Sequence, residues 1–136
     1  MTGKAALHIL DAGNGKVIYK VPNPDQLFYT YPKFFRYNEI ISAIRDTSGK
    51  MSLVEIDVQT GSTKYLTPLS YNVIGFPCIS NDTIYFTNSF EQNDELFAYT
   101  YTDKQLWKLV YNNDAGLGKY QPTANGYLIA GAKFTP

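Results

Sequence analysis

The residues best suited to chemistry are His8 and Cys78, because they are the only histidine and the only cysteine of the chain. A catalytic histidine works between a nucleophile and a carboxylate, and a reactive thiol needs a base or a positive charge beside it. Each residue instead lies in a run typical of a strand, so we interpret His8 as structural or exposed and Cys78 as a small core residue. The sequence also lacks a Gly-x-Ser-x-Gly nucleophile motif. We therefore expect a protein that is not an enzyme.

Metal and cofactor sites find no better support in the sequence. Zinc needs several cysteine or histidine ligands, and calcium needs several oxygen ligands at set positions. Residues 46–50 offer one carboxylate and then a lysine, which is typical of a hairpin loop. The run 116–119 is faintly similar to a phosphate-binding loop, but Tyr120 stands where that loop needs serine or threonine. We expect no metal and no cofactor.

Composition limits the partners of the chain. The 136 residues suit one domain, and 44% hydrophobic with 18% charged residues indicates a folded core. Twelve basic and twelve acidic residues give a formal net charge of zero, which argues against a nucleic-acid partner. No apolar run approaches the roughly 20 residues of a membrane helix, so we expect no membrane insertion. A net charge of zero also favours self-association.

An internal repeat organises the chain. Pro32, Pro77 and Pro122 are each separated by 45 residues, and each precedes a turn and then an apolar run, at 40–44, 83–86 and 127–130. A second register aligns 6–11 with 52–57 and 95–100, and each of these runs leads through a turn into another strand, at 17–21, 63–67 and 106–110. Two registers therefore agree on a unit of about 45 residues with four short strands.

Such a unit is typical of a β-propeller blade. With the strands of a blade named A to D from the axis outward, the chain has the order CD-ABCD-ABCD-AB. The predicted fold class is all-β, with blades of four antiparallel strands: a half-blade at 5–21, blades at 27–67 and 73–110, and a half-blade at 119–134. Three blades are too few for a closed ring, so we expect either a segment of a longer propeller or half of a six-bladed ring formed by two copies.

The unit resembles the blades of the TolB-like, or WD40-like, propeller family. The run from Pro77 to Phe86 is similar to the first hairpin of that family's blade, and 55–61 with 65–67 is similar to its later strands and Thr-Gly turn. The resemblance covers nearly the whole chain at the level of the blade. It implies a binding or scaffold module and weakly implies a periplasmic or secreted protein.

Two other functions stay open at this point. The chain could be the propeller part of a hydrolase or peptidase whose catalytic domain lies outside it, which a catalytic motif in the flanking gene sequence would reveal. It could also be a complete ligand-binding domain of another all-β fold, in which the sheets would not stack around an axis.

Partner binding is predicted at one rim of the blades, for a protein or peptide partner. In a propeller the D-to-A and B-to-C loops share a face, and loops carry function more often than the scaffold does. The candidate residues on these loops are Arg45, Asp46, Tyr71, Phe90 and Asn113. A second candidate is the aromatic run 27–37, which we interpret mainly as packing between blades.

Overall fold

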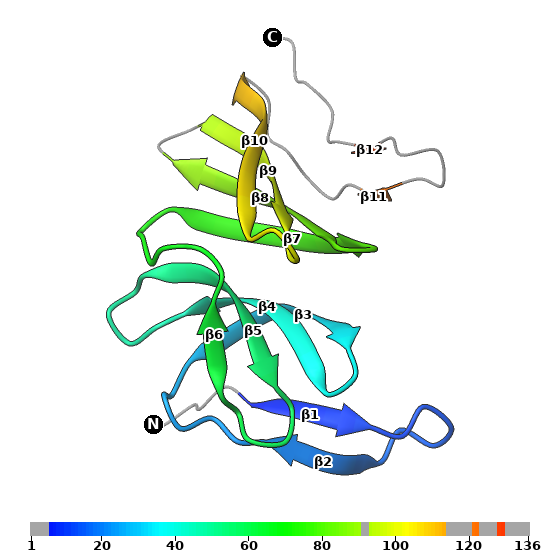
Figure 1. The fold of residues 1–136 in the computed structure, drawn as a ribbon. Coiled ribbons are helices and arrows are strands. Elements are labelled where there is room, and N and C mark those ends of the chain that lie inside the picture. The colour runs from blue at the N-terminus through cyan, green and yellow to red at the C-terminus, as the bar shows by residue number, and fades with distance from the viewer. Residues whose placement is uncertain (1–5, 91–92, 114–120, 123–127, 130–136) are drawn as a thin grey trace, which may run out of the picture. The chain divides into compact units, whose positions relative to one another are not determined.

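The computed structural model describes residues 6–90, 93–113, 121–122 and 128–129. These residues form antiparallel β-sheets without a helix, as the sequence predicts for an all-β chain (Figure 1). The chain divides into two compact units, Met1–Tyr71 and Asn72–Pro136, and each is described by itself.

Unit 1 contains a hairpin and a four-stranded sheet. Strands β1 (Leu7–Leu10) and β2 (Val17–Val21) pair with each other. The sheet has the order β3-β4-β5-β6, in which every strand neighbours the next strand along the chain. Its strands are β3 (Phe28–Arg36), β4 (Glu39–Arg45), β5 (Met51–Asp57) and β6 (Thr63–Tyr65).

Unit 2 repeats this arrangement. Its four-stranded sheet consists of β7 (Val73–Ser80), β8 (Thr83–Phe90), β9 (Asn93–Thr100) and β10 (Gln105–Asn113), again paired in chain order. The short strands β11 (Gln121–Pro122) and β12 (Leu128–Ile129) pair with each other, and β11 lies near β7.

The first strands of the two sheets carry the same irregularity at their prolines. Pairing between β3 and β4 shifts between Thr30 and Lys33, and pairing between β7 and β8 shifts between Gly75 and Cys78. In each case the residue before the proline, Tyr31 or Phe76, has a positive φ of 53° or 50°. A proline has no N–H to donate to the ladder and is tolerated at a bulge. The 45-residue spacing of the prolines is therefore matched by a repeat in the backbone.

A second repeated feature is a hairpin turn that begins with an aspartate. After β1 the Asp11 carboxylate accepts hydrogen bonds from Gly13 N (2.7 Å) and Asn14 N (3.2 Å), and Gly15 N donates to Asp11 O (2.8 Å). After β5 the Asp57 carboxylate accepts from Gln59 N (2.9 Å) and Thr60 N (3.0 Å), and Gly61 N donates to Asp57 O (2.8 Å). Gly15 and Gly61 have the same φ of 74°, which favours glycine. The two turns are thus one structure used twice.

The turn after β9 also has a positive φ at its fifth position, although no glycine stands there. Lys104 occupies the fifth position of that turn, counted from Thr100, and has a φ of 54°. Positive φ is unfavourable for a residue with a Cβ. Unit 2 therefore keeps the turn at a cost in backbone strain.

The core of unit 1 lies between the hairpin and one face of the sheet. Leu7 and Val21 of the hairpin join a buried cluster with residues of β4 and β5, namely Ile40, Ile44, Val54 and Ile56. Buried aliphatic side chains of this kind each contribute roughly 1.5–3 kcal/mol. The Tyr19 hydroxyl also donates to Gln59 O (2.5 Å), which ties β2 to the turn after β5. The hairpin is consequently stacked on the sheet and does not extend it.

Among the described residues, no helix is long and apolar enough to cross a membrane.

Candidate functional site

The predicted rim residue Asp46 begins the turn between β4 and β5. Its Oδ1 accepts hydrogen bonds from the Ser48 hydroxyl (2.6 Å), Ser48 N (2.9 Å) and Lys50 N (2.9 Å). The Ser48 hydroxyl bond is the main reason why the pKa of the Asp46 carboxyl lies below its usual value. This oxygen shapes the turn.

Arg45 and Tyr71 lie at the same end of unit 1 as this turn. Ser70 forms a β-bridge with Met51, and this bridge places the adjacent Tyr71 beside the turn. The Lys50 ammonium lies 5.6 Å from the centre of the Tyr71 ring, which is within the range of a cation–π contact. Arg45 is exposed, with Nη2 3.5 Å from the sulfur of Met51. The structure therefore brings the three predicted residues of unit 1 together, and adds Lys50 to them.

We call Arg45, Lys50 and Tyr71 the Tyr71 patch. The Tyr71 side chain is 71% exposed. A large aromatic side chain in this position does not gain the free energy that burial of its apolar surface would give. The Lys50 ammonium faces the ring, Arg45 is exposed at the same end of unit 1, and the Asp46 carboxylate lies beside Lys50, so the patch combines an apolar ring with charged groups. Such a surface fits a partner segment that carries a carboxylate next to an apolar side chain.

The other two predicted rim residues belong to unit 2. Phe90 ends β8 and pairs with Asn93, whereas Asn113 ends β10 and pairs with Asp94. The backbone therefore places both residues at one end of that sheet. Their side chains lie outside the part of the structure that is described.

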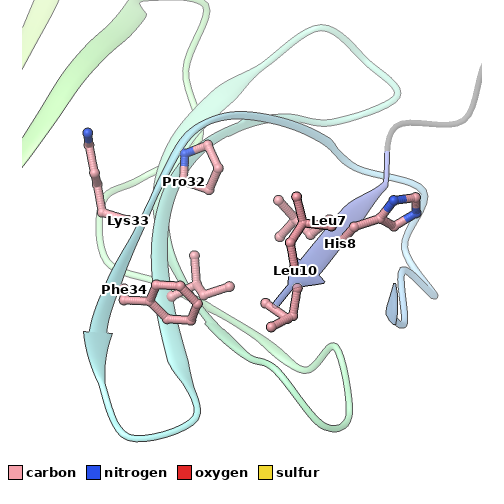
Figure 2. Close-up of a pocket in the computed structure, with 8 residues that line it drawn as sticks. Leu7, His8, Leu10, Pro32, Lys33 and Phe34 are labelled. Atoms are coloured by element: carbon pink, nitrogen blue, oxygen red, sulfur yellow. The ribbon is translucent and has the colours of Figure 1, made fainter. Parts of the chain in front are cut away.

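A pocket that the sequence analysis missed lies between β1 and β3 of unit 1 (Figure 2). Its volume is about 270 Å³. The lining is mainly apolar and comes from the two strands and the start of β4: Leu7, His8, Ile9, Leu10, Pro32, Lys33, Phe34 and Ile40. Figure 2 shows Leu10 and Phe34 on opposite sides of the space, while the Lys33 side chain extends away from β1. This lining suits an apolar group.

The aromatic run 27–37 divides between the core and the surface. Leu27 is buried and Tyr29 packs against the core, and burial raises the pKa of the Tyr29 hydroxyl. Phe28, Phe34 and Tyr37 are exposed, and Tyr37 is 91% exposed. Packing within unit 1 thus explains only part of this run. The sequence showed a high density of aromatic residues in this run, but this density does not predict which side chains are exposed.

The single histidine, His8, and the single cysteine, Cys78, have ordinary surroundings. His8 is exposed at the edge of the pocket. Cys78 is half-buried and packs, with Phe76 and Tyr85, against Leu96. Within the described ranges, no three histidine, cysteine, aspartate or glutamate side chains come together as a metal site would require.

One pair of carboxyl groups is unusual. Glu39 in β4 and Glu55 in β5 each have one oxygen, Oε2, that is buried and accepts no hydrogen bond from the described residues. Burial is the first cause, and the nearby Glu55 carboxyl the second, of a pKa of Glu39 above its usual value. Two carboxyls this close ionise together only at a cost. Glu39 is therefore a pH-sensitive group in the sheet.

Comparisons with protein families, with curated proteins and with solved structures find no match to this chain.

Proposed function

We propose that the chain is a segment of a β-propeller that serves as a non-catalytic binding or scaffold module for a protein or peptide partner. The observation that carries the proposal is the repeat of local geometry. The same bulge occurs at Pro32 and Pro77, and the same aspartate turn follows β1 and β5. Four-stranded antiparallel units that recur every 45 or so residues are typical of blades.

The stacking in unit 1 also supports the proposal. The faces of β1 and β2 lie on the face of the next sheet, with Leu7 and Val21 packed against Ile40 and Val54. Repeat proteins bury the faces of successive units against each other in this way. A hairpin that simply extended the sheet would not support stacked blades.

Binding is proposed at the Tyr71 patch. Loops and turns carry function because they tolerate change while the strands hold them in place. Tyrosine and arginine are common among the residues that dominate binding energy, and here Tyr71 and Arg45 are both exposed. The expected partner is a peptide segment with an acidic residue beside an aromatic or aliphatic one.

The test is a selection of binders from a displayed peptide library, followed by calorimetry with the selected peptides. We expect acidic and aromatic residues to be enriched, and Tyr71→Ala to weaken binding by tenfold or more, which corresponds to about 1.4 kcal/mol. The matched control is Tyr37→Ala, at the opposite end of β4, which should leave affinity unchanged. Binders that lose affinity with Tyr37→Ala and not with Tyr71→Ala would refute the site.

A further inference from the structure

The pocket between β1 and β3 opens onto the core of unit 1. Two of its lining residues, Leu7 and Ile40, belong to the buried cluster and are only 8% and 4% exposed. Two others, Leu10 and Phe34, are 52% and 71% exposed and lie on opposite sides of the space (Figure 2). The pocket therefore has a floor of core side chains between two walls of exposed apolar side chains. An apolar molecule placed there would remove both walls from water, which is favourable.

Both strands that line the pocket depart from regular pairing at the lining residues. The register of β1 with β2 shifts between Ile9 and Leu10. The register of β3 with β4 shifts on either side of the pair Lys33 and Phe34. Bulges of this kind bend a strand, change the direction of its side chains and are common next to functional sites. The pocket thus results from the local backbone of these two strands.

The two polar residues of the lining do not direct a charge into the pocket. Lys33 directly precedes Phe34 in β3, and successive side chains of a strand point to opposite faces. Figure 2 accordingly shows the Lys33 side chain extending away from β1. His8 directly follows the buried Leu7 and is exposed at the edge of the pocket. A charged molecule in the pocket would lose hydration and gain no counter-charge from these side chains, which is unfavourable.

We propose that this pocket binds a small uncharged molecule built around a single aromatic ring. Its volume of about 270 Å³ is below the roughly 300–1,000 Å³ of sites for drug-sized ligands. An apolar cavity of about 150 Å³ is already large enough for benzene, so one ring with a small substituent fits. The exposed ring of Phe34 favours an aromatic occupant, because aromatic rings pair in offset or edge-to-face contacts.

This site goes beyond the proposed function and is independent of it. The lining residues lie in β1, β3 and β4 and include none of the three residues of the Tyr71 patch. The packing of the hairpin on the sheet within unit 1 is sufficient to form the pocket. The site therefore does not depend on how blades are arranged around an axis, or on the binding of a peptide.

The experiment titrates the full chain with toluene and, separately, with benzoate at neutral pH. The two molecules carry the same ring and differ in charge. Nuclear magnetic resonance of the methyl groups of Leu7, Leu10 and Ile40 locates the binding. We expect toluene to shift these signals to saturation, and benzoate to bind more weakly by about tenfold or more.

Two variants test the walls of the pocket. Leu10→Trp should fill the space and weaken toluene binding by about tenfold or more. The matched control is Ile18→Trp, an exposed position on the other strand of the same hairpin, which should leave toluene binding unchanged. Phe34→Ala removes the aromatic wall with little loss of buried surface, because Phe34 is 71% exposed. It should also weaken toluene binding, and it keeps the test valid if Leu10→Trp disturbs the fold.

Several results would overturn the proposal. These are equal binding of toluene and benzoate, equal losses with Leu10→Trp and Ile18→Trp, full affinity in Phe34→Ala, or methyl shifts that never saturate. Shifts of the same methyl signals when the chain alone is diluted would assign the pocket to a second copy, and would overturn it too. The peptide experiment with Tyr71→Ala measures a different site, so failure of one proposal is distinguishable from failure of the other.

Discussion

Replacing Gly61 with alanine should loosen the hairpin β1–β2 from the sheet on which it is stacked. A Cβ at Gly61 would lie 2.0 Å from Pro22 O and 2.7 Å from Pro22 C. Pro22 directly follows β2, so the turn after β5 touches the backbone that leads out of the hairpin. Because both partners are backbone atoms, the clash can be relieved only if the hairpin or the turn moves.

The magnitude follows from two costs. Alanine at a φ of 74° costs about 1–2 kcal/mol in backbone strain, and overpacking of a close contact adds about 1–3 kcal/mol. We therefore expect Gly61→Ala to lower the free energy of unfolding by about 2–5 kcal/mol. Gly15→Ala is the matched control, because Gly15 has the same φ but no atom within 4 Å of its added Cβ. It should cost only the strain, about 1–2 kcal/mol.

Urea unfolding followed by circular dichroism measures both variants, and hydrogen exchange of the β1 and β2 amides locates the change. Loss of protection in the hairpin with Gly61→Ala, and little loss with Gly15→Ala, is the expected result. Equal destabilisation by the two substitutions would refute the reasoning, since the contact with Pro22 would then contribute nothing.

Three further predictions follow from local features. Lys104→Gly should stabilise the chain by about 1 kcal/mol, because it relieves the positive φ of the turn after β9, and thermal unfolding would show it. Thr67→Val should cost about 1–3 kcal/mol in urea unfolding, because the Leu53 N–H loses the Thr67 hydroxyl that accepts its hydrogen bond at 3.0 Å. Glu39→Gln should stabilise the chain at neutral pH. The raised pKa of Glu39 means that the folded state favours the protonated carboxyl, so wild-type stability falls as the pH rises through that pKa. The gap between variant and wild type should widen over the same pH range in urea titrations, and a gap that narrows with rising pH would contradict the assignment.

The elements of the fold could be read from the sequence where the signal was local. The Pro32 and Pro77 spacing, and the alignment of 6–11 with 52–57, identified strands that the structure contains. The aspartate turn at Asp57 was predicted from its Thr-Gly pair. These features depend on residues close together in the chain, which is why the sequence alone was sufficient.

The candidate site was harder to predict, because it depends on contacts between distant segments. The contact of Lys50 with Tyr71 requires the β-bridge between Met51 and Ser70. No local sequence pattern indicates that bridge. The β1–β3 pocket likewise requires knowing that the hairpin stacks on the sheet. Asp46 was predicted as a binding residue from its place in a loop, and the structure adds that its Oδ1 accepts hydrogen bonds from its own turn.

The most direct test of the account is to measure two distances between spin labels, one between inner strands and one between outer strands. In a propeller, neighbouring blades diverge with distance from the axis, so the outer distance exceeds the inner one. One pair replaces Phe28 and Val73, exposed residues of the predicted inner strands β3 and β7. The other replaces Lys64 and Trp107, exposed residues of the predicted outer strands β6 and β10. Both use the Cys78→Ala background, with excess unlabelled chain to suppress distances between copies.

Strand spacing sets the expected result. Three spacings of about 4.8 Å place an outer strand about 14 Å farther from the axis than an inner one. In a six-bladed ring, neighbouring blades diverge by about 60°. The outer pair of labels should therefore be separated by about 14 Å more than the inner pair. An outer distance equal to or shorter than the inner one would contradict the propeller, and with it the central claim about this chain.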